Sequence, residues 1–249
     1  MPLSHLDARD RATIERVREE LRGVFAGELQ AVALTGEAAG AGYRPGRSPL
    51  ELAVMLDHVT PEALRRVQPR LRAWGRRRVA PPLLVDPPWL AEARDVFPLE
   101  LLELTEHHLQ IHGASDPFAR IEIGLEHLRL EVERQLRGKL LHLWEAYLEH
   151  GHSKRRLREL LLETPVAFEW ILRGALRAAE ALAQPAPRRE QGEALLAEVE
   201  RRTGVALPTF RLLERARRVG EHLPSDGLDA IFDAYLAEVR ALVARANAR

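Results

Sequence analysis

Two apolar runs joined by a glycine-rich segment form a layout that suits phosphoryl transfer. Leu34-Thr35-Gly36-Glu37 ends the first run, and Ser48-Pro49-Leu50-Glu51 opens the second. A turn led by glycine can place backbone N–H groups against phosphates. Carboxylates two positions apart on a strand point to the same face, where both can hold divalent cations. Two such cations would activate a hydroxyl group and stabilise a leaving pyrophosphate.

The elements that must position these residues follow from the hydrophobic pattern of the first half. Apolar residues at helical spacing predict a helix over 6–21, and Thr60-Pro61 opens a second helix that runs to about Trp74. Short apolar runs predict strands over 28–36, 48–56, 81–86 and 97–104. Strands that alternate with helices predict an α/β or α+β layer of about four strands.

The second half of the chain has a purely helical pattern. Apolar residues step by three or four from Phe118 to Tyr147, which predicts one long helix that opens at Asp116-Pro117. Further helices are predicted over 153–162, 165–183, 188–203, 208–220 and 226–246. Their lengths and short connections are typical of an antiparallel bundle. We therefore expect an α+β domain over 1–113, a mixed sheet with flanking helices, followed by an all-α bundle domain over 114–249.

Composition excludes several classes of function. The 249 residues include no cysteine, which excludes a disulfide scaffold, a thiolate zinc site and a cysteine nucleophile. The 37 Lys and Arg residues balance 37 Asp and Glu residues, which argues against a nucleic-acid binder because such proteins usually carry a basic excess. No apolar run is long enough to span a bilayer, and the charged N-terminal stretch lacks the apolar core of a signal peptide. We expect a cytoplasmic protein.

The segment 34–56 resembles the DNA polymerase β-like nucleotidyltransferase superfamily. That superfamily has an apolar strand, Gly-Ser, a short helix and loop, then Ser-Asp-x-Asp at the start of the next strand, with a third acidic residue on a later strand. By this resemblance Gly36 and Ser48 lie near the phosphates, and Glu100 or Glu103 on the predicted strand 97–104 is the third acidic residue. The stretch from Asp95 and the helix that follows also resemble uncharacterised bacterial nucleotidyltransferase-like proteins with a helical domain.

Three positions depart from the superfamily pattern. Glu37 replaces the serine that helps to seat the triphosphate, and its negative charge would repel that group. Pro49 replaces the first metal-binding aspartate and has no side-chain ligand atom. Glu51 replaces the second aspartate and keeps its charge. Because two metal ions need shared carboxylates, the resemblance predicts a fold that has lost catalysis.

The function expected from the sequence is therefore a catalytically inactive nucleotidyltransferase fold that serves as a binding or interaction module. It would bind a nucleotide or small anionic ligand near Gly36, Glu37 and Ser48, or a protein partner or second copy through the bundle. The alternative is an enzyme that transfers a nucleotide from ATP to a hydroxyl, with Glu51 and Glu100 or Glu103 holding Mg²⁺. A second alternative is a toxin–antitoxin component, because Arg137 and His142 have the Arg-x4-His spacing of the helical HEPN ribonucleases.

Two further clusters could bind ligands. His108 and His112 would share one face of a helix, a spacing that binds zinc when a third ligand converges. An arginine-rich stretch with Trp74 at its centre could contact RNA, or it could be the solvated face of a helix with Trp74 turned inward. Its arginines are Arg65, Arg66, Arg70, Arg72, Arg76, Arg77 and Arg78.

Overall fold

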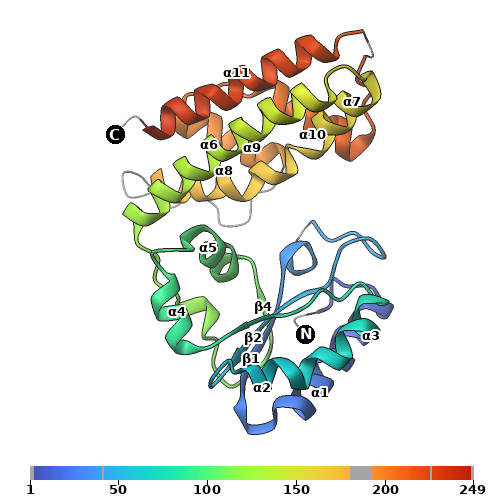
Figure 1. Cartoon of the computed structure of the whole chain (residues 1–249), viewed down its shortest axis with the longest axis vertical. Helices are drawn as coiled ribbons and strands as arrows, with labels where there is room; N and C mark the ends of the chain where they lie inside the picture. Colours follow the sequence, from blue (N-terminus) through green and yellow to red (C-terminus); the bar gives the residue numbers. More distant parts are fainter. Residues whose placement is uncertain (1–2, 41, 180–191, 225, 248–249) are drawn as a thin grey trace. The chain divides into compact units, whose positions relative to one another are not determined.

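The computed structural model describes residues 3–40, 42–179, 192–224 and 226–247. The chain divides into two compact units, Met1–Ile123 and Gly124–Arg249 (Figure 1). The first unit contains a mixed sheet with helices on both faces, and the second is helical throughout its described elements. The fold class predicted from the sequence is therefore confirmed.

In the described part of the first unit, four strands form one sheet in the order β3-β2-β1-β4. The strands are β1 (Leu29–Thr35), β2 (Glu51–Leu56), β3 (Leu83–Val85) and β4 (Leu109–His112). The central strand β1 runs antiparallel to both of its neighbours, and β2 and β3 are parallel. Both central strands are almost continuously apolar because helices cover both faces of the sheet.

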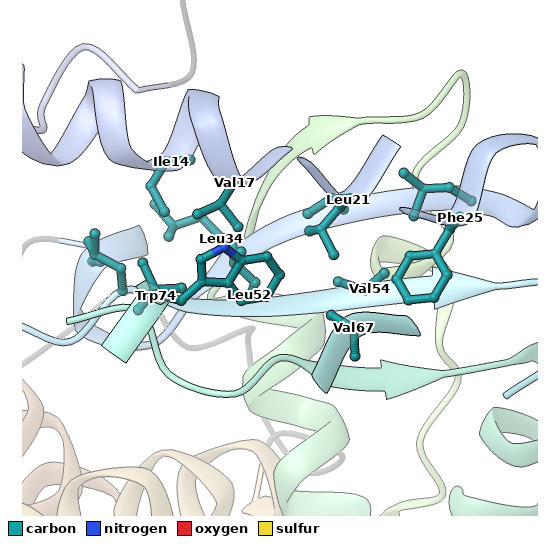
Figure 2. Packing of buried hydrophobic residues seen from close by; sticks show 14 of the residues in the cluster. Ile14, Val17, Leu21, Phe25, Leu34, Leu52, Val54, Val67 and Trp74 are labelled. Atoms are coloured by element: carbon teal, nitrogen blue, oxygen red, sulfur yellow. The ribbon is translucent and has the colours of Figure 1, made fainter. Parts of the chain in front are cut away.

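Three helices cover one face of the sheet: α1 (Ala8–Phe25), α2 (Pro61–Val67) and α3 (Leu71–Gly75). Asp7 caps α1 by accepting a hydrogen bond from the backbone N–H of Asp10. The buried stripe of α1 contacts Leu34, Leu52 and Val54 of the sheet (Figure 2). The helix continues four residues beyond the predicted end at Leu21, because the apolar stripe continues to Phe25.

The other face of the sheet packs against α4 (Pro87–Ala93), α5 (Pro98–Glu106) and a short 3-10 turn, η4 (Phe118–Arg120). The prediction of a strand over 97–104 is wrong, since this stretch forms α5. Pro98 stands in the first turn of α5, where its missing N–H costs nothing, and Leu101 and Leu104 are one helical turn apart and both buried. The fourth strand is β4, which follows α5 in the chain.

The second unit contains six described helices: α6 (Leu125–His150), α7 (Lys154–Glu163), α8 (Val166–Ala179), α9 (Glu193–Thr203), α10 (Pro208–Val219) and α11 (Leu228–Asn247). Its core includes Phe168, Phe210 and Tyr235, whose rings meet edge to face. Residues 180–183 and 188–191, which the sequence predicts to be helical, lie outside the described residues.

The long helix of the second unit begins later than the sequence predicts. Asp116-Pro117 opens only η4, and α6 starts at Leu125. Phe118 does not extend the stripe of α6, because it is fully buried against the sheet of the first unit. Across the described ranges, no helix combines the length and the apolar character needed to cross a membrane.

Candidate nucleotide-binding site

The ends of β1 and β2 bring Gly36 and Glu51 together. The strand register pairs Thr35 with Glu51, so Gly36 begins the turn directly beside the Glu51 side chain. Gly36 has φ +64°, a left-handed conformation that favours glycine. A β-carbon at this position would overlap with Oε2 of Glu51. The carboxylate of Glu51 therefore lies in the space that the missing side chain of Gly36 leaves open.

The carboxylate of Glu51 has no counter-charge among the described residues. Among the residues that the structure describes, none donates a hydrogen bond to its carboxylate or forms an ion pair with it. Burial raises the pKa of Glu51 above its usual range, and the negative charge of Glu37 raises this pKa further. Because its carboxylate has no described partner and its pKa is raised, Glu51 is the residue of this site best suited to bind a cation.

Glu37 is engaged by the loop that connects β1 to β2. The hydroxyl of Ser48 donates to Oε2 of Glu37 at 2.7 Å, and the guanidinium of Arg44 lies 3.3 Å from the same carboxylate. The Ser48 hydroxyl also accepts a hydrogen bond from the backbone N–H of Arg44 at 2.9 Å. Ser48 is fully buried, so both functions of its hydroxyl are used within the loop.

Three residues that the motif does not include hold this loop in place. Asp10 of α1 is buried, and its carboxylate accepts hydrogen bonds from Arg78 at 2.5 Å and from the Tyr43 hydroxyl at 2.8 Å. Arg78 also donates to the backbone carbonyl of Ser48. The sequence pattern did not predict these contacts, because Tyr43 and Arg78 are 33 and 68 positions away from Asp10.

The third acidic position is not found on a strand. Glu100 and Glu103 lie on α5, so the strand that was expected to carry them does not exist. The strand that does pair with β1 on this side is β4, and its residues Leu109–His112 include no carboxylate. Within the described residues, no group of three His, Asp or Glu side chains is arranged to hold a metal ion.

The side chain that the end of β4 contributes is a histidine. Leu109 pairs with Leu34, and the two strands are antiparallel. His108, one residue before Leu109, therefore lies opposite Thr35, one residue after Leu34. The Nε2 atom of His108 lies 2.9 Å from the Asp116 carboxylate, which also accepts from the backbone N–H groups of Phe118 and Ala119. The hydrogen bonds of Asp116 thus connect His108 to the N-terminal end of η4.

The zinc and RNA hypotheses lose the features that suggested them. His108 and His112 are not on a helix: His108 precedes β4, and His112 ends it. Trp74 is fully buried, and its indole N–H donates to Glu20 at 2.8 Å, so it cannot stack on a base. Four of the arginines in the basic stretch form ion pairs with carboxylates, namely Arg65 with Glu62, Arg66 with Glu28, Arg70 with Glu20 and Arg78 with Asp10.

No protein-family model matches the chain, and no curated protein matches it. Among solved structures, the chain is similar to the spectinomycin adenyltransferase AAD(9) from Enterococcus faecialis, solved with ATP and spectinomycin. The two share 13% identity over 92% of this chain and 99% of that one, with a TM-score of 0.49.

Proposed function

We propose that this protein is a nucleotidyltransferase-like binding or interaction module that does not transfer nucleotides. The observation that carries the proposal is that one carboxylate, Glu51, stands where the chemistry needs several. Pro49 contributes no ligand atom, and β4 contributes no acid. Two-metal phosphoryl transfer requires carboxylates that are shared between the ions. The residues at this end of the sheet do not fit such a centre.

Glu37 adds a second obstacle, this time to the nucleotide. A phosphate in this loop would need the donors that Glu37 already occupies, the Ser48 hydroxyl and the Arg44 guanidinium. The carboxylate of Glu37 is an anion built into the chain at the place where an anionic ligand would bind. To enter, a nucleotide must displace Glu37 and tolerate its charge, so we expect binding of ATP to be weak.

The test is a binding and transfer assay on a repair series. We expect no calorimetric signal with millimolar ATP and Mg²⁺ for the unmodified chain, and no transfer of label from α-labelled ATP. Glu37→Ser should free Ser48 and Arg44 and tighten ATP binding by about tenfold or more, equivalent to about 1.4 kcal/mol. Glu37→Gln is the matched control, because it removes the charge but keeps an acceptor for Ser48.

The second series addresses the metal. Pro49→Asp restores a pair of carboxylates two positions apart and should create Mg²⁺-dependent binding that Glu51→Ala abolishes. Magnesium-dependent nucleotide transfer by the unmodified chain, lost in Glu51→Ala, would overturn the proposal. Tight ATP binding by the unmodified chain that is indifferent to Glu37→Ser would overturn the role given to Glu37.

One observation favours the enzyme as a second candidate. The carboxylate of Glu51 has no cation beside it among the described residues, and its pKa is raised, as is common for groups that work on a ligand. A single Mg²⁺ brought in with ATP would neutralise this charge. Under this alternative, ATP and Mg²⁺ together would bind more tightly than either alone, and Glu51→Gln would remove that synergy.

A further inference from the structure

The long helix α6 has two apolar faces, and the described residues of the second unit pack mainly against one of them. On the other face, the ring of Trp144 has the guanidinium of Arg240 from α11 above it, 5.7 Å from the ring centre. Leu128, Val132, Leu136 and Leu143 are buried where α6 packs against α8 and α11. A separate set of large apolar side chains is exposed on the same helix. These are Leu130 (52% exposed), Leu141 (53%), Trp144 (38%) and Leu148 (84%).

The exposed set follows the spacing of a helix–helix seam. Positions 130, 134, 137, 141, 144 and 148 are separated alternately by four and three residues, the pattern that keeps one line of side chains facing a partner helix. At 100° per residue, Leu130, Leu141 and Leu148 fall within about 20° of one line. Arg134 and Arg137 occupy the two middle positions and are exposed. We call the residues of these six positions the α6 outer seam.

Basic and acidic residues on and beside the α6 outer seam are separated along the helix. Arg134 and Arg137 lie toward the N-terminal side of Leu141, and the exposed Glu145 and Glu149 lie toward its C-terminal side. A partner helix of the same sequence that runs antiparallel brings its acidic end beside the arginine end of the first, with Glu145 opposite Arg137. A parallel copy would place like charges opposite each other, which is unfavourable.

We propose that the α6 outer seam binds the same seam of a second copy, antiparallel, about a two-fold axis beside Leu141. This axis places Leu141 against Leu141 of the second copy and Arg137 against its Glu145. It also places Trp144 of one copy over Gly138 of the other. A β-carbon at Gly138 would meet nothing within 4 Å, so no neighbouring atom covers the helix surface at this position. The interface is self-complementary, as two-fold symmetry requires.

The expected dimer is weak but specific. Tryptophan and arginine are the residues that most often dominate binding energy, and both lie in the centre of this seam. Arg137 forms a partly exposed ion pair with Glu133 within α6, and a pair of this kind contributes little and can exchange for a contact across the interface. Arg134 is paired with the buried carboxylate of Glu131 and should keep that partner in the dimer. One helix face is smaller than a standard interface, so the dimer should depend on concentration. The proposal does not depend on what the nucleotide-binding site does.

The absence of cysteine gives a direct first test. Leu141→Cys introduces a single thiol that the two-fold axis places opposite its own copy, so mild oxidation should yield a disulfide-linked dimer on a non-reducing gel. Val219→Cys is the matched control, because Val219 is also exposed (78%) but lies on α10. Equal cross-linking of the two variants, or none for Leu141→Cys, would overturn the proposal.

Charge reversal then tests the direction and the identity of the partner. Sedimentation velocity of the full chain over a range of concentrations should show a monomer–dimer equilibrium. Arg137→Glu and Glu145→Arg should each weaken it about tenfold or more, and the double variant should restore it, because two identical copies then carry complementary charges again. A chain that stays monomeric at every concentration, or a double variant no better than the singles, would show that this seam does not pair with itself.

Discussion

Two carboxylates of the first unit, Asp10 and Glu51, are buried to different degrees, and their pKa values are shifted in opposite directions. Asp10 is buried on α1 and is surrounded by partners, Arg78 and Tyr43. Burial alone would raise the pKa of Asp10, but the hydrogen bonds from Arg78 and Tyr43 and the charge of Arg78 outweigh it, so the pKa is lowered. Glu51 has no such partner in the described structure, and its pKa is raised.

The difference separates an acid that the fold needs from one that it tolerates. The pairing of Asp10 joins α1 to the loop that carries Ser48, so its charge contributes to stability. The charge of Glu51 costs free energy, because no described residue neutralises it. An acid without such compensation is a more specific indicator of ligand binding than one that is paired.

The strongest way to break this comparison is to remove Asp10. Asp10→Ala should lower the free energy of unfolding by about 3 kcal/mol, the low end for breaking a buried ion pair, because Arg78 keeps partial access to water. Chemical denaturation at neutral pH measures the change. Glu15→Ala, at an exposed position of the same helix, is the control and should change stability by less than about 0.5 kcal/mol.

The same variant should flatten the acid limb of the pH profile. A lowered pKa contributes stability that is present above the unfolded value and is lost as the pH falls through the folded value. Unmodified protein should therefore lose stability more steeply below about pH 4 than Asp10→Ala does. Equal losses for the two proteins would show that Arg78 and Tyr43 do not stabilise the charge of Asp10.

The sequence predicts the frame of the site better than its interior, and the reason is distance along the chain. Strands β1 and β2 were predicted because each is a local apolar run, and the resemblance set Gly36 and Glu51 in one motif. Their contact follows from the strand register, which pairs Thr35 with Glu51. The pairing of Asp10 with Arg78 spans 68 positions and leaves no periodic trace. Contacts of that kind are created by folding and cannot be read from spacing.

The segment 97–104 shows a second limit. A run of alternating leucines and glutamates fits a half-buried strand, and the sequence offers few signals against it. In the structure this run is α5. Leu101 and Leu104 pack on the face of the sheet opposite α1, together with Phe118 from a later segment. Short apolar runs do not distinguish strand from helix by periodicity alone. Tertiary packing decides the outcome.

A smaller effect tests how Glu51 is placed. Gly36→Ala should cost about 2 kcal/mol, because the new side chain needs a left-handed backbone and overlaps with the Glu51 carboxylate. Gly46 is a matched control: it has φ +70° and open space around its α-carbon, so Gly46→Ala should report the backbone cost alone, about 1 kcal/mol. Denaturation midpoints of the two variants measure the difference.

The double variant Gly36→Ala with Glu51→Ala isolates the contact. If the carboxylate occupies the space beside Gly36, the cost of Gly36→Ala should fall to that of Gly46→Ala once Glu51 is shortened. A cost that stays the same in the Glu51→Ala background would place the carboxylate elsewhere, and Glu51 would then be free to turn toward solvent.

The smallest expected effect sharpens the comparison most, because its sign is opposite to that of Asp10. Glu51→Gln should raise the free energy of unfolding at pH 7 by about 1 kcal/mol or less, since it removes a half-buried charge without changing the size of the side chain. A raised folded pKa means that the penalty is absent below the unfolded value and grows as the pH rises through the folded value. The gain in stability from Glu51→Gln should therefore vanish near pH 4, in the range where the stability that Asp10 contributes begins to decline. Glu92→Gln, at an exposed position of α4, should give no gain at either pH. A Glu51→Gln variant that is less stable than the unmodified protein at pH 7 would mean that the carboxylate has a partner in solution, and a bound cation would then be the first partner to seek.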